Sequence, residues 1–172
     1  MEVDQVKFET MRPYLLQASI VGEIGLDTVW TKITLAQQLP VLIQQLEFAR
    51  QNQKPVILHT EGTERLMFEI IKAYPDLKFL VHWYSDAESI DEYIQAGCLF
   101  SIGIDLMGNA VSTAIVKKAP VEQLLIESDG IDSIEWTYAG QKASFDQYLT
   151  LLKQNMDIIA QMKQMPVAIF EK

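Results

Sequence analysis

The 172 residues carry 14 basic and 23 acidic side chains, a formal charge of −9 at pH 7. A protein that wraps the phosphate backbone of a nucleic acid relies on clustered Lys and Arg, and no such cluster occurs here, so the charge argues against that class. Hydrophobic residues make up 49% and charged residues 22%, which excludes a disordered chain and allows one domain with a sizeable core.

The N-terminus and the cysteine content bear on location. No apolar run approaches the ~18 residues that a membrane span needs, and residues 1–10 lack the basic and apolar regions of a secretory signal. A single cysteine, Cys98, excludes an internal disulfide framework and fits a reducing compartment. We therefore expect a cytoplasmic protein that does not associate with membranes.

Apolar runs of strand length alternate with segments of helical periodicity along the chain. In chain order we expect a helix over 1–17, a strand over 20–26, a helix over 40–51, a strand over 56–58, a helix over 63–74, a strand over 79–81, a helix ending at 96, a strand over 98–104, a helix over 110–118, a strand over 124–127 and a helix over 145–165. Such alternation implies parallel strands joined by right-handed crossovers, the α/β class.

Local signals set some of these boundaries. Ser85 and Glu88 form a capping-box pattern that we expect to open the helix ending at Ala96, and Gly97 is a typical residue after a helix C-terminus. The helix over 145–165 is expected to turn four apolar side chains inward: Leu149, Leu152, Met156 and Ile159.

The length distinguishes two architectures. About five βα units form either a doubly wound sheet or part of a barrel, because a complete (β/α) barrel usually needs eight units and ~250 residues. No segment rich in Gly, Ser or Pro divides the chain, so we expect a single domain over residues 1–172.

Four chemically functional side chains stand where the expected strands end. His59 closes the run PVILH and His82 closes KFLVH; Glu23 lies in SIVGEIGLD and Asp129 follows QLLIES. Catalytic groups of parallel α/β folds lie at the carboxyl ends of the strands. Neutral imidazole and carboxylate suit zinc, iron, manganese or a mixed divalent pair. The sequence therefore predicts a metal site formed by these residues.

Neighbouring residues leave alternatives open. Strand alternation lets Glu23 and Asp27 point to the same face, although Asp27 could instead only begin the following loop. Asp129 precedes a glycine and fits a turn as well as a ligand. Trp83 and Tyr84 follow His82 directly, where aromatic side chains either contact a substrate above the sheet or belong to the core.

Taken in order, these segments resemble the TatD-like metal-dependent hydrolases of the amidohydrolase superfamily. The matching segments are VGEIGLD, the helix with Gln38, Gln45 and Ala49, and then KPVILHT, VHWYSD, AGCLFSIG and LLIESDG. The resemblance covers residues 19–160. It implies parallel βα units of a TIM-like barrel, incomplete at about five strands, with roughly the C-terminal two-thirds of the barrel present and the N-terminal part missing.

The resemblance also implies a mechanism. Glu23 would bridge two metal ions, His59 and His82 would bind the second ion, and Asp129 would bind the first and handle the proton of the attacking water. One or two divalent ions (zinc, manganese, magnesium or iron) would serve as cofactors of a deoxyribonuclease-like hydrolase. The reaction would be attack of activated water on a phosphodiester or related bond.

Two positions depart from the family pattern. The family's first strand carries an H-x-H motif, whereas this chain has no third histidine, and Glu61 stands where many members carry an arginine. A carboxylate there would repel a phosphate. Two alternatives stay open: a catalytically impaired barrel fragment that acts as an assembly subunit, and a small-molecule phosphoesterase or amidase. We expect a small-molecule or nucleic-acid-fragment substrate, and association of identical chains through open sheet edges.

Overall fold

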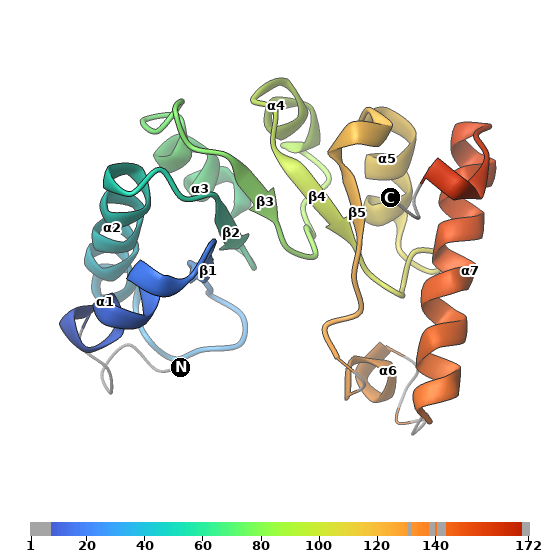
Figure 1. The fold of residues 1–172 in the computed structure, drawn as a ribbon, viewed down its shortest axis with the longest axis horizontal. Coiled ribbons are helices and arrows are strands. Elements are labelled where there is room, and N and C mark those ends of the chain that lie inside the picture. The colour runs from blue at the N-terminus through green and yellow to red at the C-terminus, as the bar shows by residue number, and fades with distance from the viewer. Residues whose placement is uncertain (1–7, 131, 138–139, 141–143, 170–172) are drawn as a thin grey trace. The chain divides into compact units, whose positions relative to one another are not determined.

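The computed structural model describes residues 8–130, 132–137, 140 and 144–169. The chain divides between Cys98 and Leu99 into two compact units, and Figure 1 labels the helices and strands in chain order. Each unit contains strands paired in parallel with helices between them, so the expected α/β class with parallel βα units is confirmed. No helix in the described ranges is long and apolar enough to cross a membrane.

Over residues 8–98, the first unit consists of three parallel strands and four helices. β2 pairs with β1 on one side and with β3 on the other. The elements are α1 (Phe8–Gln17), β1 (Val21–Gly25), α2 (Leu35–Gln51), β2 (Val56–His59), α3 (Glu64–Ile71), β3 (Phe79–Val81) and α4 (Ile90–Gln95). Its core is formed by fully buried side chains from strands and helices, among them Leu42, Leu46, Leu58, Met67 and Tyr93.

A close approach of two backbones fixes how β1 lies on β2. Gly25 pairs with His59, and a Cβ on Gly25 would lie only 1.8 Å from the carbonyl oxygen of His59. Only glycine allows this approach. Gly22 is similarly crowded, because its Cβ would lie 2.6 Å from Ile57 Cβ. The two glycines therefore bring the side chains at the end of β1 next to those at the end of β2.

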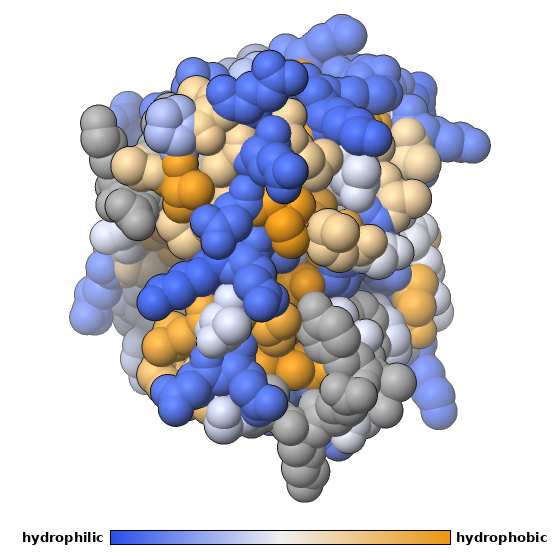
Figure 2. Space-filling view, turned by 90° about the vertical axis from the view of Figure 1, so that its right-hand side faces the viewer, coloured by the Kyte–Doolittle hydropathy of each residue, from blue (hydrophilic) through white to orange (hydrophobic). Residues whose placement is uncertain are grey.

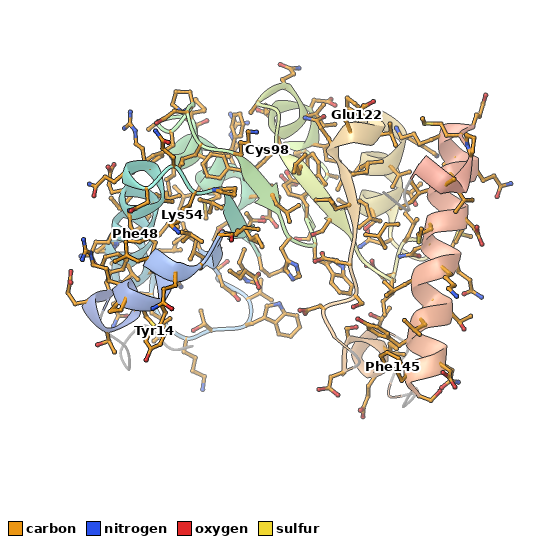
Figure 3. The ribbon with its side chains drawn as sticks, in the orientation of Figure 1. Tyr14, Phe48, Lys54, Cys98, Glu122 and Phe145 are labelled. Carbon is orange, nitrogen blue, oxygen red and sulfur yellow. The ribbon has the colours of Figure 1, made fainter. Side chains whose placement is uncertain are left out.

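A lysine ties α1 to the rest of the first unit. Lys54, labelled in Figure 3, donates from Nζ to the carbonyl oxygens of Leu16 (3.0 Å) and Ala18. The last carbonyls of a helix have no intrahelical partners, and the ammonium group of Lys54 supplies hydrogen bonds to them. Its positive charge also interacts favourably with the negative end of the helix dipole. Phe8 adds an edge-on contact with Phe48 of α2, the ring centroids lying 5.8 Å apart.

The second unit has two parallel strands, three α-helices and two short 3-10 helices (η1 and η2) in its described part. β4 pairs with β5, and α7 packs against α5 and β5. The elements are β4 (Leu99–Ile102), α5 (Ala110–Lys118), η1 (Val121–Gln123), β5 (Leu124–Ile126), α6 (Asp132–Thr137), α7 (Phe145–Lys163) and η2 (Val167–Ile169). Asn155, buried on α7, donates to the carbonyl oxygen of Gly103 over 2.6 Å, which fixes α7 to the residues after β4.

Most expected elements are present, with shifted ends. The strand over 79–81 and the helix over 110–118 have the expected bounds. α2 begins at Leu35, five residues before the expected start, because Thr34 donates its N–H to the Gln37 side chain and opens the helix there. α6 was not expected, and residues 1–7 of the expected first helix lie outside the described residues.

The expected capping box at Ser85 is wrong. α4 begins at Ile90, and the Ser85 hydroxyl instead donates to Glu64 of α3. The carboxylate of Asp86 accepts from the N–H groups of Glu88 and Ser89 and fixes the turn before the helix. The expected C-terminus is confirmed, since Gly97 follows the helix with φ +77°.

The inward face of α7 differs from the expected one. Ile159 is fully buried as expected, but Leu149 is 39% exposed, and Asn155 takes one of the buried positions. Figure 2 looks onto the side of the molecule where α7 lies and shows hydrophilic residues interspersed with hydrophobic ones. Phe145, at the start of α7, is 63% exposed. The apolar face of α7 is thus only partly covered within the second unit.

We expect Gly25→Ala to destabilise the first unit strongly, because the new methyl group would overlap the His59 carbonyl. Overpacking of this kind costs about 1–3 kcal/mol, and occasionally more. The measurement is urea unfolding of the full chain, followed by circular dichroism. Gly108→Ala is the matched control, since a Cβ there meets nothing closer than 3.8 Å. Equal midpoints for the two variants would contradict the role given to Gly25.

Candidate metal centre

The register of the first unit aligns the ends of its strands. Gly25 pairs with His59, and Leu58 pairs with Val81, the residue before His82. The N–H of His82 donates to the carbonyl oxygen of Leu58 over 2.9 Å, which continues the ladder to the end of β3. The two histidines therefore lie at the same edge of the sheet, as the sequence predicts.

His59 lies between two carboxylates. Its Nδ1 is 2.9 Å from Glu23 Oε1, and its Nε2 is 3.0 Å from Asp27 Oδ2. His82 Nε2 lies 3.8 Å from the same Glu23 oxygen. The structure thus brings together three of the predicted ligands, Glu23, His59 and His82, and it adds Asp27. Asp27 does more than begin the loop, and it shares a histidine with Glu23 as strand alternation allows.

These contacts raise the pKa of His59 and lower the pKa values of Glu23 and Asp27. The hydrogen bond to Glu23 raises the pKa of His59; burial opposes the shift, and the hydrogen bond to Asp27 reinforces it. The hydrogen bond from His59 lowers the pKa of Glu23 against the effect of burial. Burial opposes ionisation of Asp27, but the N–H groups of Trp30 and Val29, together with His59, outweigh it and lower its pKa. Without metal, the site favours a protonated imidazole between two carboxylates.

Asp27 is held from several sides. Its Oδ1 accepts from the N–H groups of Val29 (2.6 Å) and Trp30 (2.8 Å), which forms a tight turn after β1. Its own N–H donates to Gln38 Oε1 over 2.9 Å, and its carbonyl oxygen accepts from Gln38 Nε2 over 2.8 Å. Gln38 is buried on α2 and also donates to Ile33. The position of Asp27 is therefore fixed by backbone and helix contacts.

A cavity of about 660 Å³ in the first unit borders these residues. Glu23, Asp27 and His59 form part of its polar wall. The apolar part of the wall comes from α1, α2 and the loop before α2: Met11, Leu15, Trp30, Ile33, Val41 and Leu42. The charged groups are thus reached from a space large enough for a small organic molecule.

The donor types fit a divalent cation, and the contact between Glu23 and His59 has the length of a hydrogen bond. Two ligands of a tetrahedral zinc ion, bound at 2.0–2.1 Å, lie about 3.3 Å apart. Glu23 and His59 approach to 2.9 Å, a distance typical of a shared proton. Accordingly, no group of three His, Cys, Asp or Glu side chains in the described ranges is arranged to hold an ion as it stands. A cation would replace the proton between Glu23 and His59.

Two further acids follow the end of β2 and contact Ser85, which follows β3. Ser85 Oγ lies 2.5 Å from Glu64 Oε1 and 3.2 Å from Glu61 Oε2. Glu64 is 6% exposed at the start of α3, and its carbonyl oxygen accepts from the Tyr93 hydroxyl. Glu61, the residue that departs from the family pattern, thus belongs to an acidic region in the loop after β2.

The two predicted substrate-contacting aromatics differ in placement. Trp83 is half-buried with φ +39°, a strained conformation for a non-glycine residue, and packs edge-on to His82. Tyr84 is 1% exposed and packs against Tyr93 with centroids 5.0 Å apart. Burial raises the pKa of Tyr84 well above its ordinary value. Its position argues for the core alternative, so substrate contact stays a prediction for Trp83.

Asp129 belongs to the second unit. It follows β5, is exposed, and has φ +56°. The loop around it is fixed locally, since Ser133 Oγ donates to the carbonyl oxygen of Gly130 over 2.7 Å and Ser128 Oγ bonds the Tyr148 hydroxyl over 2.6 Å. Asp is among the few non-glycine residues that adopt this left-handed conformation readily. Its roles as metal ligand and as handler of the water proton stay predictions.

Two residues of the site, Asp27 and Gln38, were not predicted from the sequence. Asp27 was left out of the predicted site although alternation places it on the face of Glu23. Gln38 carried a signal as well, because it is a polar residue at a core position of a helix: Leu42, Leu46 and Ala49 follow on the same face. A buried amide requires polar partners, and here these are the backbone groups of Asp27 and Ile33.

Comparison with known proteins gives one family. The model of the family "TatD related DNase" matches residues 3–172. The chain is 27% identical over 114 residues to "Deoxyribonuclease TATDN3" of Homo sapiens, covering 63% of the chain and 42% of that protein. It is 28% identical over 116 residues to "Uncharacterized metal-dependent hydrolase YjjV" of Escherichia coli, covering 65% of the chain and 45% of that protein.

The fold is similar to that of a solved relative. The crystal structure of the TatD homologue YjjV from Escherichia coli superposes with a TM-score of 0.75 at 22% identity. The match covers 94% of this chain and 62% of that one. The chain spans about half the length of the curated relatives it matches.

We expect His59 of the metal-free protein to titrate above its ordinary pKa of 6.5. Since the folded pKa of His59 is raised, its contribution to stability is complete below pH 6.5 and is lost as the pH rises through the folded value. Since the pKa of Glu23 is lowered from 4.5, its contribution is complete above pH 4.5 and is lost as the pH falls through the folded value. The loss of unfolding free energy in His59→Gln should therefore be largest between pH 4.5 and pH 6.5.

Histidine NMR gives the pKa, and urea unfolding across pH gives the stability difference. The control is Asp76→Asn, which removes an exposed partner of Arg50 and should leave the His59 titration unchanged. A His59 pKa at or below 6.5 would show that the two carboxylates do not act on the ring.

Proposed function

The chain belongs to the TatD related DNase family, and from this premise we propose that it is a metal-dependent hydrolase that uses Glu23, His59 and His82 to hold a divalent cation. The observation that carries the proposal is the gathering of these donors, with Asp27, around the ring of His59 at the strand ends. Relatives named as a deoxyribonuclease and as a metal-dependent hydrolase support it.

The residues of the first unit would then have distinct tasks. Glu23, whose side chain is 39% exposed, can turn toward a cation, and its carboxylate offsets part of the cation's charge. His59 and His82 bind as neutral rings, so loading releases the proton of His59. A divalent cation supplies a Lewis acid that makes water acidic enough to attack near neutral pH. Asp129 is proposed to handle the proton of that water.

The proposed substrate class follows from the negative charge near the site and of the whole chain. Glu61 and Glu64 make the segment after β2 acidic, and the whole chain carries −9. Like charges hold a polyanion away. We therefore favour a small ester or phosphoester substrate over a nucleic-acid strand. An amide substrate and a nucleic-acid fragment remain as outcomes of the assay.

Removing both histidine ligands should abolish metal binding. We expect the wild-type chain to bind Zn²⁺ or Mn²⁺ and the double variant His59→Ala, His82→Ala to bind at least about 100-fold more weakly, since an outer-sphere partner alone accounts for 10–100-fold. Titration against a chelating dye measures the affinity. Lys72→Gln, which removes an exposed partner of Glu69, serves as the control. Equal affinity of the wild type and the double variant would exclude the assigned ligands.

Hydrolysis is assayed on the metal-loaded chain with a neutral nitrophenyl ester, a nitrophenyl phosphodiester, a nitrophenyl amide and a DNA oligonucleotide. We expect Glu61→Gln to raise kcat/KM for the phosphodiester about five-fold, because one unit charge at 4 Å is worth about 1 kcal/mol in water, and to leave the neutral ester unchanged. Glu69→Gln, on the exposed side of α3, is the control. An equal change on both substrates would show that the charge of Glu61 does not select substrates.

A further inference from the structure

We infer that Asp27 is the positioning residue of the metal centre: it holds the Nε2–H of His59 so that Nδ1 is the nitrogen that binds the cation. The inference rests on the proposed metal-dependent function and assigns a role to a residue outside the predicted ligand set. An imidazole that binds a metal through one nitrogen usually donates its other N–H to a carboxylate or carbonyl, which fixes the ring and its tautomer.

The two sides of the His59 ring differ. On the Nδ1 side lies Glu23 Oε1 at 2.9 Å, and the same oxygen lies 3.8 Å from His82 Nε2. The proposed ligands thus gather on that side. On the Nε2 side, the contact within the described ranges is Asp27 Oδ2 at 3.0 Å. A cation that binds Glu23, His59 and His82 together would therefore meet Nδ1.

The two carboxylates also differ in how firmly they are held. Glu23 has a side chain 39% exposed, and its side-chain contacts in the described ranges are with the two histidines. Asp27 is 15% exposed, and its second oxygen accepts from Val29 N and Trp30 N. Its backbone is fixed on both sides by the buried Gln38. Asp27 is therefore suited to orient the ring, and Glu23 to move toward a cation.

The same contacts predict what Asp27→Asn does. The amide oxygen would stay with Val29 N and Trp30 N, because these two N–H groups need an acceptor. The amide NH2 would then take the place of Oδ2 and face His59 Nε2. Nε2 would have to accept, so the proton of the neutral ring would move to Nδ1 and block the nitrogen needed for the metal. An isosteric change thus reverses the tautomer with little change in packing.

The first experiment determines which His59 nitrogen is protonated and which is metal-bound. Long-range ¹H–¹⁵N NMR of the histidine-labelled full chain with Zn²⁺ is expected to give Zn²⁺ on Nδ1 and the proton on Nε2. Zn²⁺ on Nε2 would overturn the inference. This measurement needs no variant, so it tests the inference even if a substitution impairs folding.

The second experiment compares affinities for Zn²⁺. Asp27→Asn should bind about 10- to 100-fold more weakly than wild type, the range for loss of an outer-sphere partner, and its metal-free neutral ring should carry the proton on Nδ1. Asp76→Asn, an exposed carboxylate paired with Arg50, should keep wild-type affinity. Wild-type affinity in Asp27→Asn would overturn this inference alone, whereas a wild-type chain that binds no Zn²⁺ would overturn the proposed function with it.

Discussion

The close approach of β1 to β2 at Gly25 is the constraint on which the candidate site depends. Because Gly25 has no Cβ, its backbone can lie against the carbonyl of His59. Glu23 and Asp27, two positions before and after Gly25, can then reach the two opposite nitrogens of one imidazole. A bulkier residue would separate the strands, and the hydrogen bonds that define the site would be lost.

The charges of the site favour a positive charge between Glu23 and Asp27. Two carboxylates of lowered pKa flank an imidazole of raised pKa, so a positive charge between them is favourable. A proton on His59 supplies such a charge, and the two carboxylates raise the pKa of His59 accordingly. A divalent cation at the Glu23 side would supply more of it, and the fixed contact with Asp27 would keep the ring oriented during the exchange. Glu23 is more exposed than Asp27 and has fewer backbone contacts, so the exchange is favoured on the Glu23 side.

Several features of the fold and site could be predicted because they depend on neighbours in sequence. Apolar runs that stop at His59 and His82 identified the strand ends, and Gly97 identified the end of α4. Predictions failed where a distant residue competed for the same group. The Ser85 hydroxyl contacts Glu64, 21 residues away, instead of capping α4. For Tyr84 the sequence left two placements open, substrate contact or the core, and the structure buries it against Tyr93.

The sequence by itself determined the parallel βα class, the donor types and the residues that end the strands, since these follow from periodicity and from local turn signals. Only the tertiary structure decided which donors meet. His59 contacts partners 36 and 32 residues before it, and Gln38 supports Asp27 across 11 residues. Such contacts depend on strand register and on the space left by a missing Cβ. No local pattern in the chain encodes the distances that result.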